Sequence, residues 1–210
     1  MAATITQESL SDKVYTIIKQ QILSGELKGG TLLSEEAFAE QFGVSRTPIR
    51  EALRRLNEYG LVKLKPHSQA VVHKVDEKEF ADITRLRITL ETLVVESLLK
   101  LRAKDYIGNL YDLADQCSDL VQIGSRARLF VKDSEFHLEL ARSTGNKALF
   151  DLYNRLDSKV QLLRIAQNLD ESNLSQTIQQ HYRLLTALEN RDEQASLAFI
   201  GEHIRHASLG

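Results

Sequence analysis

Apolar residues recur every three or four positions in three stretches near the start of the chain, which is the spacing of a helix face. The first stretch is SLSDKVYTIIKQQIL. The second, EEAFAEQF, follows Ser34, a residue type that caps helices, and precedes Gly43. The third follows a second capping residue, Ser45, has Pro48 in its first turn, where no N–H is needed, and stops near Gly60. The pattern predicts three consecutive helices.

The pattern changes after these helices. LVKLK and AVVHKV are short β-branched runs separated by residues 66–69, which predicts a hairpin. From Asp76 onward the helical spacing returns, and the charged stretch around residues 73–79 is the expected linker. Breaks near residues 105–108, 124, 145–146, 168–173 and 190–192 divide the remainder into about six helices. We therefore predict a mainly α protein, with a winged helix-turn-helix over residues 1–75 and an all-helical bundle over residues 76–210.

Composition agrees with a helical protein of a reducing compartment. The chain has 42% hydrophobic residues, two prolines and no tryptophan. No apolar run reaches membrane-spanning length and the amino terminus lacks signal-peptide features, so we expect no membrane contact and a cytoplasmic location. Cys117 is the only cysteine, which excludes an intrachain disulfide, and we expect it to be a buried thiol rather than a redox sensor.

Positive charge is concentrated in one segment. The net charge is -2, but Ser45–Lys74 holds seven Lys/Arg against two Asp/Glu. This indicates a polyanionic partner, although an ordinary solvated face can have the same count. A helix fits the DNA major groove, where Arg46 and Arg50 could contact guanine, while Ser45 and Thr47 suit phosphates. Arg54 and Arg55, further along the helix, could instead pair with Glu51 or Glu58.

Polar residues occupy apolar faces in the second half of the chain. Asp133 and His137 fall on the buried side of one predicted helix, and His181 and His203 fall at the centre of the apolar faces of two others. Such side chains are costly to bury unless they are hydrogen-bonded or bind a metal. One oxygen and three nitrogen donors suit a divalent transition metal, with zinc or nickel foremost. The residues alone leave a hydrogen-bonded core and a metal site as alternatives.

Arg87 also lies within an apolar face, that of the helix EFADITRLRITLETLVVESLL. Two interpretations stand beside each other. Arg87 could pair with Glu91 one turn later, or it could bind the carboxylate of an effector through its two-pronged guanidinium.

The segment LLSEEAFAEQFGVSRTPIREALRRLNEYGLVKLKPHSQAVV resembles the amino-terminal domain of the GntR family of bacterial transcription regulators. The helical remainder resembles the FCD effector domain of the FadR-like branch, in its shorter six-helix, metal-binding form. Two positions depart from the family: Glu36 stands where many relatives have arginine, and the wing tip is HSQ instead of NRG. The resemblance implies DNA contacts at Ser45, Arg46, Thr47 and Arg50, with Arg54 and His67 as further candidates. It implies metal ligands at Asp133, His137, His181 and His203, with His206 as a substitute. It also implies an effector-binding role for Arg87.

These observations predict a ligand-responsive transcriptional regulator, a repressor rather than an activator. We expect it to be a homodimer that binds a two-fold related DNA site and senses a small organic acid through a metal-containing helical domain. One alternative is a metal-dependent hydrolase with an accessory winged-helix module. The chain shows no general base beside the Asp and His residues, no nucleophile motif and no phosphate loop, which argues against an enzyme. A third class is an interaction module whose winged helix binds protein.

Overall fold

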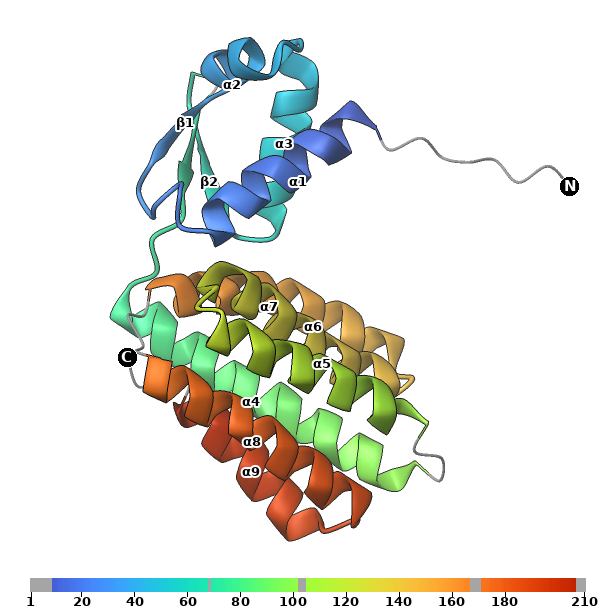
Figure 1. Ribbon diagram of the computed structural model, residues 1–210. Coiled ribbons are helices and arrows are strands. Elements are labelled where there is room, and N and C mark those ends of the chain that lie inside the picture. The colour runs from blue at the N-terminus through green and yellow to red at the C-terminus, as the bar shows by residue number, and fades with distance from the viewer. Residues whose placement is uncertain (1–8, 68, 102–104, 167–170, 207–210) are drawn as a thin grey trace, which may run out of the picture. The chain divides into compact units, whose positions relative to one another are not determined.

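The computed structural model describes residues 9–67, 69–101, 105–166 and 171–206 (Figure 1). The chain divides into two compact units, Met1–Lys74 and Val75–Gly210. Within the described ranges, no helix combines the length and apolar character needed to cross a membrane.

Unit 1 is a winged helix-turn-helix. Its elements are α1 (Leu10–Leu23), β1 (Leu32–Ser34), α2 (Glu35–Phe42), α3 (Arg46–Glu58), β2 (Val62–Lys65) and β3 (Gln69–Val72). The three helices and the β2–β3 hairpin confirm the prediction. Strand β1 was not predicted, because three residues are too few to show an alternating pattern. It pairs antiparallel with β3, which thereby becomes the central strand of the order β1-β3-β2.

Local signals set the ends of the helices in unit 1. The Ser34 side chain accepts a hydrogen bond from the Ala37 amide, and Gly43 ends α2 in the left-handed region with φ of 66°. Ser45 occupies the cap position of α3, but its side chain makes no capping hydrogen bond, so this part of the prediction was wrong. Ser45 is an exposed residue.

Helix α3 has a buried face and an exposed face. The buried face packs against α1 and contributes Ile49, Ala52, Leu53 and Leu56 to the core of unit 1. Arg46, Arg50 and Arg54 fall between these apolar positions and are exposed. The core therefore fixes which side of α3 carries the positive charge.

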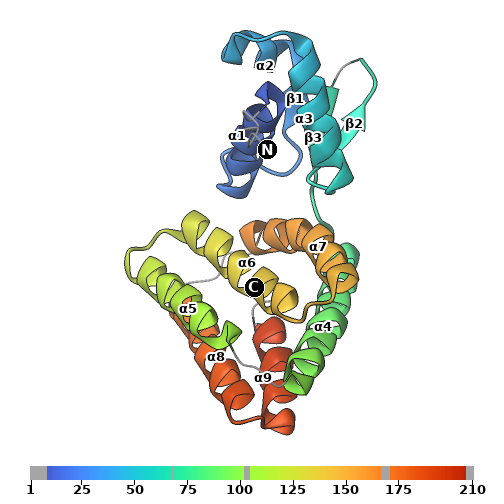
Figure 2. The same ribbon diagram turned by 90° about the vertical axis from the view of Figure 1, so that its right-hand side faces the viewer.

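Unit 2 is all-helical in its described part (Figure 2). Its helices are α4 (Glu77–Lys100), α5 (Tyr106–Gln122), α6 (Arg126–Ser143), α7 (Lys147–Ala166), α8 (Glu171–Glu189) and α9 (Glu193–His206). Gly124 and Gly145 lie in the left-handed region at two of the predicted breaks. The expected linker at residues 73–79 is partly helical, because Asp76 caps α4 by accepting a hydrogen bond from the Glu79 amide at 2.8 Å.

The core of unit 2 joins all six described helices. Phe136 and Leu140 of α6 pack with Tyr153 of α7, and Leu184 of α8 and Ile200 of α9 belong to the same apolar cluster. Helix α9 contacts both α4 and α8, while α6 contacts α5 and α7 (Figure 2). Cys117 is a free cysteine with no exposed surface, and it lies in a second cluster formed by residues of α5, α6 and α8.

Candidate functional site

The exposed surface of α3 and the neighbouring wing carry the residues predicted to contact DNA. Six side chains are exposed there: Ser45, Arg46, Thr47, Arg50, Arg54 and His67. The first turn of α3 presents its hydroxyls and cations together. His67 lies between β2 and β3 and adopts a left-handed backbone conformation with φ of 61°, so the wing turns at this residue.

Arg50 has a carboxylate partner on α2. Its Nε and one Nη donate hydrogen bonds to the two carboxylate oxygens of Glu35, at 3.2 and 2.9 Å. The Glu35 side chain is largely buried at 9% exposure, whereas that of Arg50 is 47% exposed. This two-pronged pair holds the Arg50 guanidinium at the protein surface, where Arg50, Arg54, Lys65 and Gln69 line one hollow together with Glu35.

The other arginines of α3 differ in their partners. Arg46 lies 3.7 Å from Glu36, and both side chains are more than half exposed. Arg55, expected to pair on its own helix if not with DNA, contacts α1 instead. It donates to Asp12 at 2.5 Å and lies over the Tyr15 ring at 4.2 Å, so it stabilises the α1–α3 packing.

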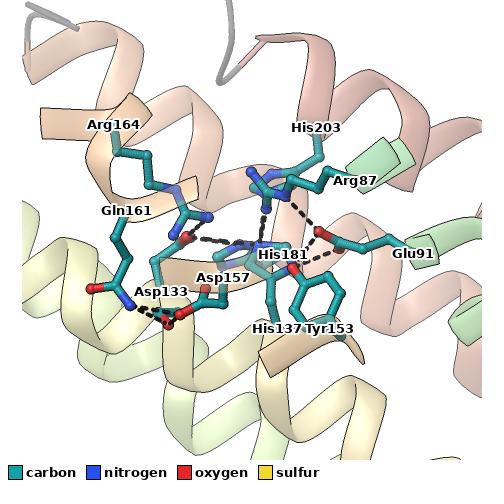
Figure 3. Close-up of polar contacts among 11 residues, drawn as sticks. Arg87, Glu91, Asp133, His137, Tyr153, Asp157, Gln161, Arg164, His181 and His203 are labelled. Carbon is teal, nitrogen blue, oxygen red and sulfur yellow. Dashed lines mark hydrogen bonds and ion pairs between the residues drawn. The ribbon is translucent and has the colours of Figure 1, made fainter. Parts of the chain in front are cut away.

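The four predicted ligands come together in unit 2 (Figure 3). Asp133 and His137 lie one turn apart on α6, His181 lies on α8 and His203 on α9. All four are buried, and one candidate ligand atom from each lies within 4.8 Å of the others. His206, the possible substitute, is not part of this set. We call these four residues the Asp–His cluster.

Several polar atoms of the Asp–His cluster lack hydrogen bonds. Oδ1 of Asp133 and Nε2 of His181 lie 3.1 Å apart, yet neither makes a hydrogen bond of good geometry, and the Nδ1 atoms of His181 and His203 are also unpaired. The Nε2 atoms of His137 and His203 face one another at 2.9 Å. Buried polar atoms are rarely left unpaired. The cluster is therefore not a saturated hydrogen-bonded core.

Glu91 on α4 orients the His137 ring through its Nδ1 atom. One Glu91 oxygen lies 2.7 Å from His137 Nδ1, and the other accepts from Arg87 Nε at 2.6 Å and from the Tyr153 hydroxyl at 2.7 Å. Burial raises the pKa of Glu91, but Arg87 and His137 outweigh burial and hold this pKa well below its usual range. An ionised Glu91 accepts the Nδ1–H of His137, which leaves the Nε2 lone pair pointing into the cluster.

Arg87 therefore forms the ion pair with Glu91 that was the first of the two interpretations of this residue. Its side chain is 4% exposed, and its Nη2 also lies 2.9 Å from His137 Nε2. The guanidinium thus lies directly beside the Asp–His cluster. A contact between Arg87 and an effector stays a prediction.

The charge states of the cluster follow from its surroundings. Burial raises the pKa of Asp133, but Arg164 of α7, which forms a very short ion pair with its Oδ2, outweighs burial and lowers this pKa well below the usual range. Burial lowers the pKa of His137 and of His203. At neutral pH Asp133 is therefore a carboxylate and His137 and His203 are neutral imidazoles, which are the forms that bind metal ions.

Sequence reasoning missed the partners that α7 supplies. Tyr153, Asp157, Gln161 and Arg164 are all buried, and they follow one another at spacings of three or four residues. The same helical-face construction that located Asp133 and His137 would have placed these polar residues on the inward side of α7.

Comparisons with known proteins agree with both units. Residues 10–72 match the model for bacterial regulatory proteins of the gntR family, and residues 82–206 match the FCD domain. The gluconate operon transcriptional repressor of Bacillus licheniformis is 26% identical over 92% of this chain and 81% of its own length. The transcriptional repressor RspR of Escherichia coli is 23% identical over 96% and 88%. The structure of E. coli McbR/YncC has the same fold, with a TM-score of 0.81, 23% identity and 95% of each chain covered.

Proposed function

Because the chain belongs to the GntR family of DNA-binding transcription regulators and carries an FCD domain, we propose that it is a repressor controlled by a small organic acid. The observation that carries the ligand-sensing part is the buried Asp–His cluster with its unpaired polar atoms. Two relatives named above are repressors, which supports the direction of control. The family consists of transcription factors, so the hydrolase alternative has no support. In this proposal residues 1–75 bind DNA in the cytoplasm, and residues 76–210 bind the effector and a second copy of the chain.

The exposed first turns of α3 are the proposed DNA-reading surface. Arg50 is the central residue, because its guanidinium is presented at the surface in a fixed orientation by Glu35. Arg50→Ala should cost about 1–3 kcal/mol of binding to the operator and reduce discrimination against random DNA. Fluorescence anisotropy at several salt concentrations would measure both, with Arg142→Ala on α6 as the matched loss of an exposed arginine. Equal operator binding by the Arg50 and Arg142 variants would exclude this role.

The Asp–His cluster fits a divalent transition metal. Two ligands of one zinc ion lie about 3.0 to 4.2 Å apart, given bonds of about 2.1 Å. The 3.1 Å separation falls within this range, the 2.9 Å separation lies just below it, and the 4.8 Å limit lies above it, so binding one ion requires only small side-chain shifts. Asp133, His137, His181 and His203 would hold the ion, and its remaining coordination positions would accept a carboxylate oxygen. Zinc and nickel suit this set of donors best.

Metal analysis tests this centre directly. The protein purified without chelator should contain about one zinc or nickel ion per chain. His137→Gln should lose this ion, whereas His206→Gln, a change on the same unit outside the cluster, should keep it. A wild-type protein that neither contains nor takes up zinc or nickel would refute the metal centre and leave the DNA-binding role intact.

Helix α4 supports the proposed homodimer. Leu86 and Leu93 lie two turns apart on α4, and each is 44% exposed. Exposed apolar residues on one face of a helix suit an interface with a second copy. Leu86→Glu combined with Leu93→Glu should give a monomer in sedimentation. Leu152→Glu, which changes a leucine of α7 that is 51% exposed, should leave the dimer intact. A wild-type monomer at micromolar concentration would contradict the proposal.

The effector is proposed to bind beside the metal and to shift the dimer between forms that bind and do not bind DNA. A carboxylate is the expected ligand group because arginine side chains adjoin the cluster from two helices. Arg87 was the predicted anchor for a second negative group, and its strong pairing with Glu91 would have to be broken for that role. Loss of operator binding on addition of an acid, at unchanged zinc content, would support this control.

A further inference from the structure

A cavity adjoins the Asp–His cluster between α6, α7 and α8. Leu129 and Phe130 of α6 and Leu174 and Ile178 of α8 supply its apolar wall, and Asp133, Arg164 and Thr177 complete the lining. We call it the α6–α8 cavity. Asp133 belongs both to this cavity and to the Asp–His cluster, so the cavity lies directly beside the candidate metal ligands.

Arg164 is incompletely paired in this cavity. Its Nη2 contacts Asp133 Oδ2, but its Nη1 is fully buried and has no hydrogen-bond partner, and the whole residue is 5% exposed (Figure 3). An unpaired buried N–H of a charged group is costly, which favours an anion as the partner of Nη1. Arg87 differs, because its guanidinium bonds both to Glu91 and to His137.

The buried charges indicate how many negative charges the ligand carries. Among the described residues of unit 2, the buried Asp, Glu, Lys and Arg side chains are Arg87, Arg164, Glu91, Asp133 and Asp157. Two cations against three carboxylates give one excess negative charge, and a divalent metal changes this to one excess positive charge. A single carboxylate neutralises the metal-loaded centre, whereas a dicarboxylate would again leave buried charge uncompensated.

We propose that Arg164 binds the carboxylate of a monocarboxylic acid whose apolar chain enters the α6–α8 cavity. This inference rests on the proposed effector-sensing function and names both the ligand class and its anchor. The guanidinium provides the polar recognition through its Nη1, and Leu129, Phe130, Leu174 and Ile178 provide an apolar surface for the chain. Dicarboxylic acids and acids with many hydroxyl groups would place polar atoms against that surface without partners.

The size of the cavity limits the ligand further. Its volume is about 20 Å³, which is roughly the space of one water-sized group. A chain of a few carbons therefore enters only if side chains of the wall move, and Leu174 of α8 is 7% exposed and stands at the cavity. Short acids should bind more tightly than long ones, and removing atoms from Leu174 should shift this preference.

The experiment measures binding of defined acids to the full-length, zinc-loaded protein by isothermal titration calorimetry. The probes are butyrate, hexanoate, succinate and 1-butanol, which separate one charge from two and from none. Butyrate should bind, and succinate should bind at least about tenfold more weakly because its second carboxylate would lie against the apolar wall without a partner. Butanol should also bind at least about tenfold more weakly, because it lacks the carboxylate and a charged hydrogen bond is worth about 1.5–3 kcal/mol. Arg164→Gln should weaken butyrate binding about 10- to 100-fold for the same reason. Arg183→Gln, which removes an exposed arginine of α8, should have no effect.

A second variant keeps the test decisive if Arg164→Gln misfolds. Leu174→Ala should improve hexanoate relative to butyrate, since it enlarges the cavity without touching a charge. The inference is overturned if succinate binds as tightly as butyrate, if folded Arg164→Gln keeps its butyrate affinity, or if Leu174→Ala leaves the chain-length preference unchanged. Zinc content and operator binding are measured on the same samples. If zinc content and operator binding are unchanged while one of these results is found, only the ligand assignment is overturned. Wild-type protein without zinc would instead refute the proposed metal centre.

Discussion

Replacing Glu91 with glutamine removes one negative charge from the interior of unit 2 without changing the size of the side chain. Glu91 is 2% exposed and accepts hydrogen bonds from Arg87, Tyr153 and His137. The variant keeps one carbonyl acceptor but directs an N–H₂ group toward donors. Arg87 would then be a buried cation without a counter-charge, and His137 would lose the carboxylate that orients its ring.

The expected cost has two parts. Removing one partner of a buried ion pair lowers the free energy of unfolding by about 3–5 kcal/mol. Loss of the carboxylate behind a metal-binding imidazole lowers metal affinity by about 10- to 100-fold. Helix α4 offers a matched control, because Lys78 and Asp82 form an ion pair at the same spacing of four residues but at the surface. Asp82→Asn should cost less than about 1 kcal/mol.

Urea denaturation of the metal-free proteins measures the first part, and competition with a zinc-binding dye measures the second. Both variants lose one carboxylate of α4, so any difference between them reports burial and contact with His137. The reasoning is wrong if Glu91→Gln costs no more stability than Asp82→Asn. A large loss of stability with unchanged zinc affinity would support the stabilising ion pair but exclude a role for Glu91 in orienting His137.

Three further outcomes are expected. Glu36→Gln should tighten operator binding several-fold in anisotropy measurements, because the exposed Glu36 carboxylate lies beside Arg46 and repels phosphate. Equal or weaker binding would contradict this. Cys117 should react with a thiol reagent only on unfolding, since burial raises the pKa of its thiol, and rapid labelling of the native protein would disprove it. Hydrogen bonds from Ser9, and then from Arg55, lower the pKa of Asp12. Its contribution to unit 1 stability is therefore fully present above the usual carboxylate range and is lost as pH falls below that range through the lowered pKa. Asp12→Asn should flatten the acid denaturation curve there, and an unchanged curve would contradict this.

The sequence predicted features that repeat along the chain better than features that depend on contacts between distant segments. The buried stripe of α3 defines its exposed cationic face, so the spacing of apolar residues was enough to place Arg46 and Arg50 on the surface. Asp133 and His137 were located in the same way, because an inward direction is a property of one helix. Their meeting with His181 and His203 could not be derived from periodicity, since a helix face does not reveal which neighbouring face it contacts. The family resemblance supplied that pairing, and the structure agrees with it.

The partners of functional residues were harder to predict than the residues themselves. Glu35 follows the capping residue of α2, yet nothing in its local pattern indicates that it pairs with Arg50 on the next helix. Arg164 lies on an inward face that could have been recognised, but its contact with Asp133 requires the packing of α7 on α6. Strand β1 was too short to show an alternating pattern, and the strand that it pairs with, β3, lies far along the chain.

The last helix of the described structure also determines when the Asp–His cluster can form. His203 lies on α9, which packs on α4 and α8, while Asp133 and His137 lie on α6. During synthesis α6 leaves the ribosome well before α9, so the growing chain holds an incomplete ligand set until α9 docks. Contacts between distant segments form late because they must overcome the entropy of closing long loops. Metal capture would therefore mark completion of the helical unit, and a chain shortened before α9 could not acquire the same centre.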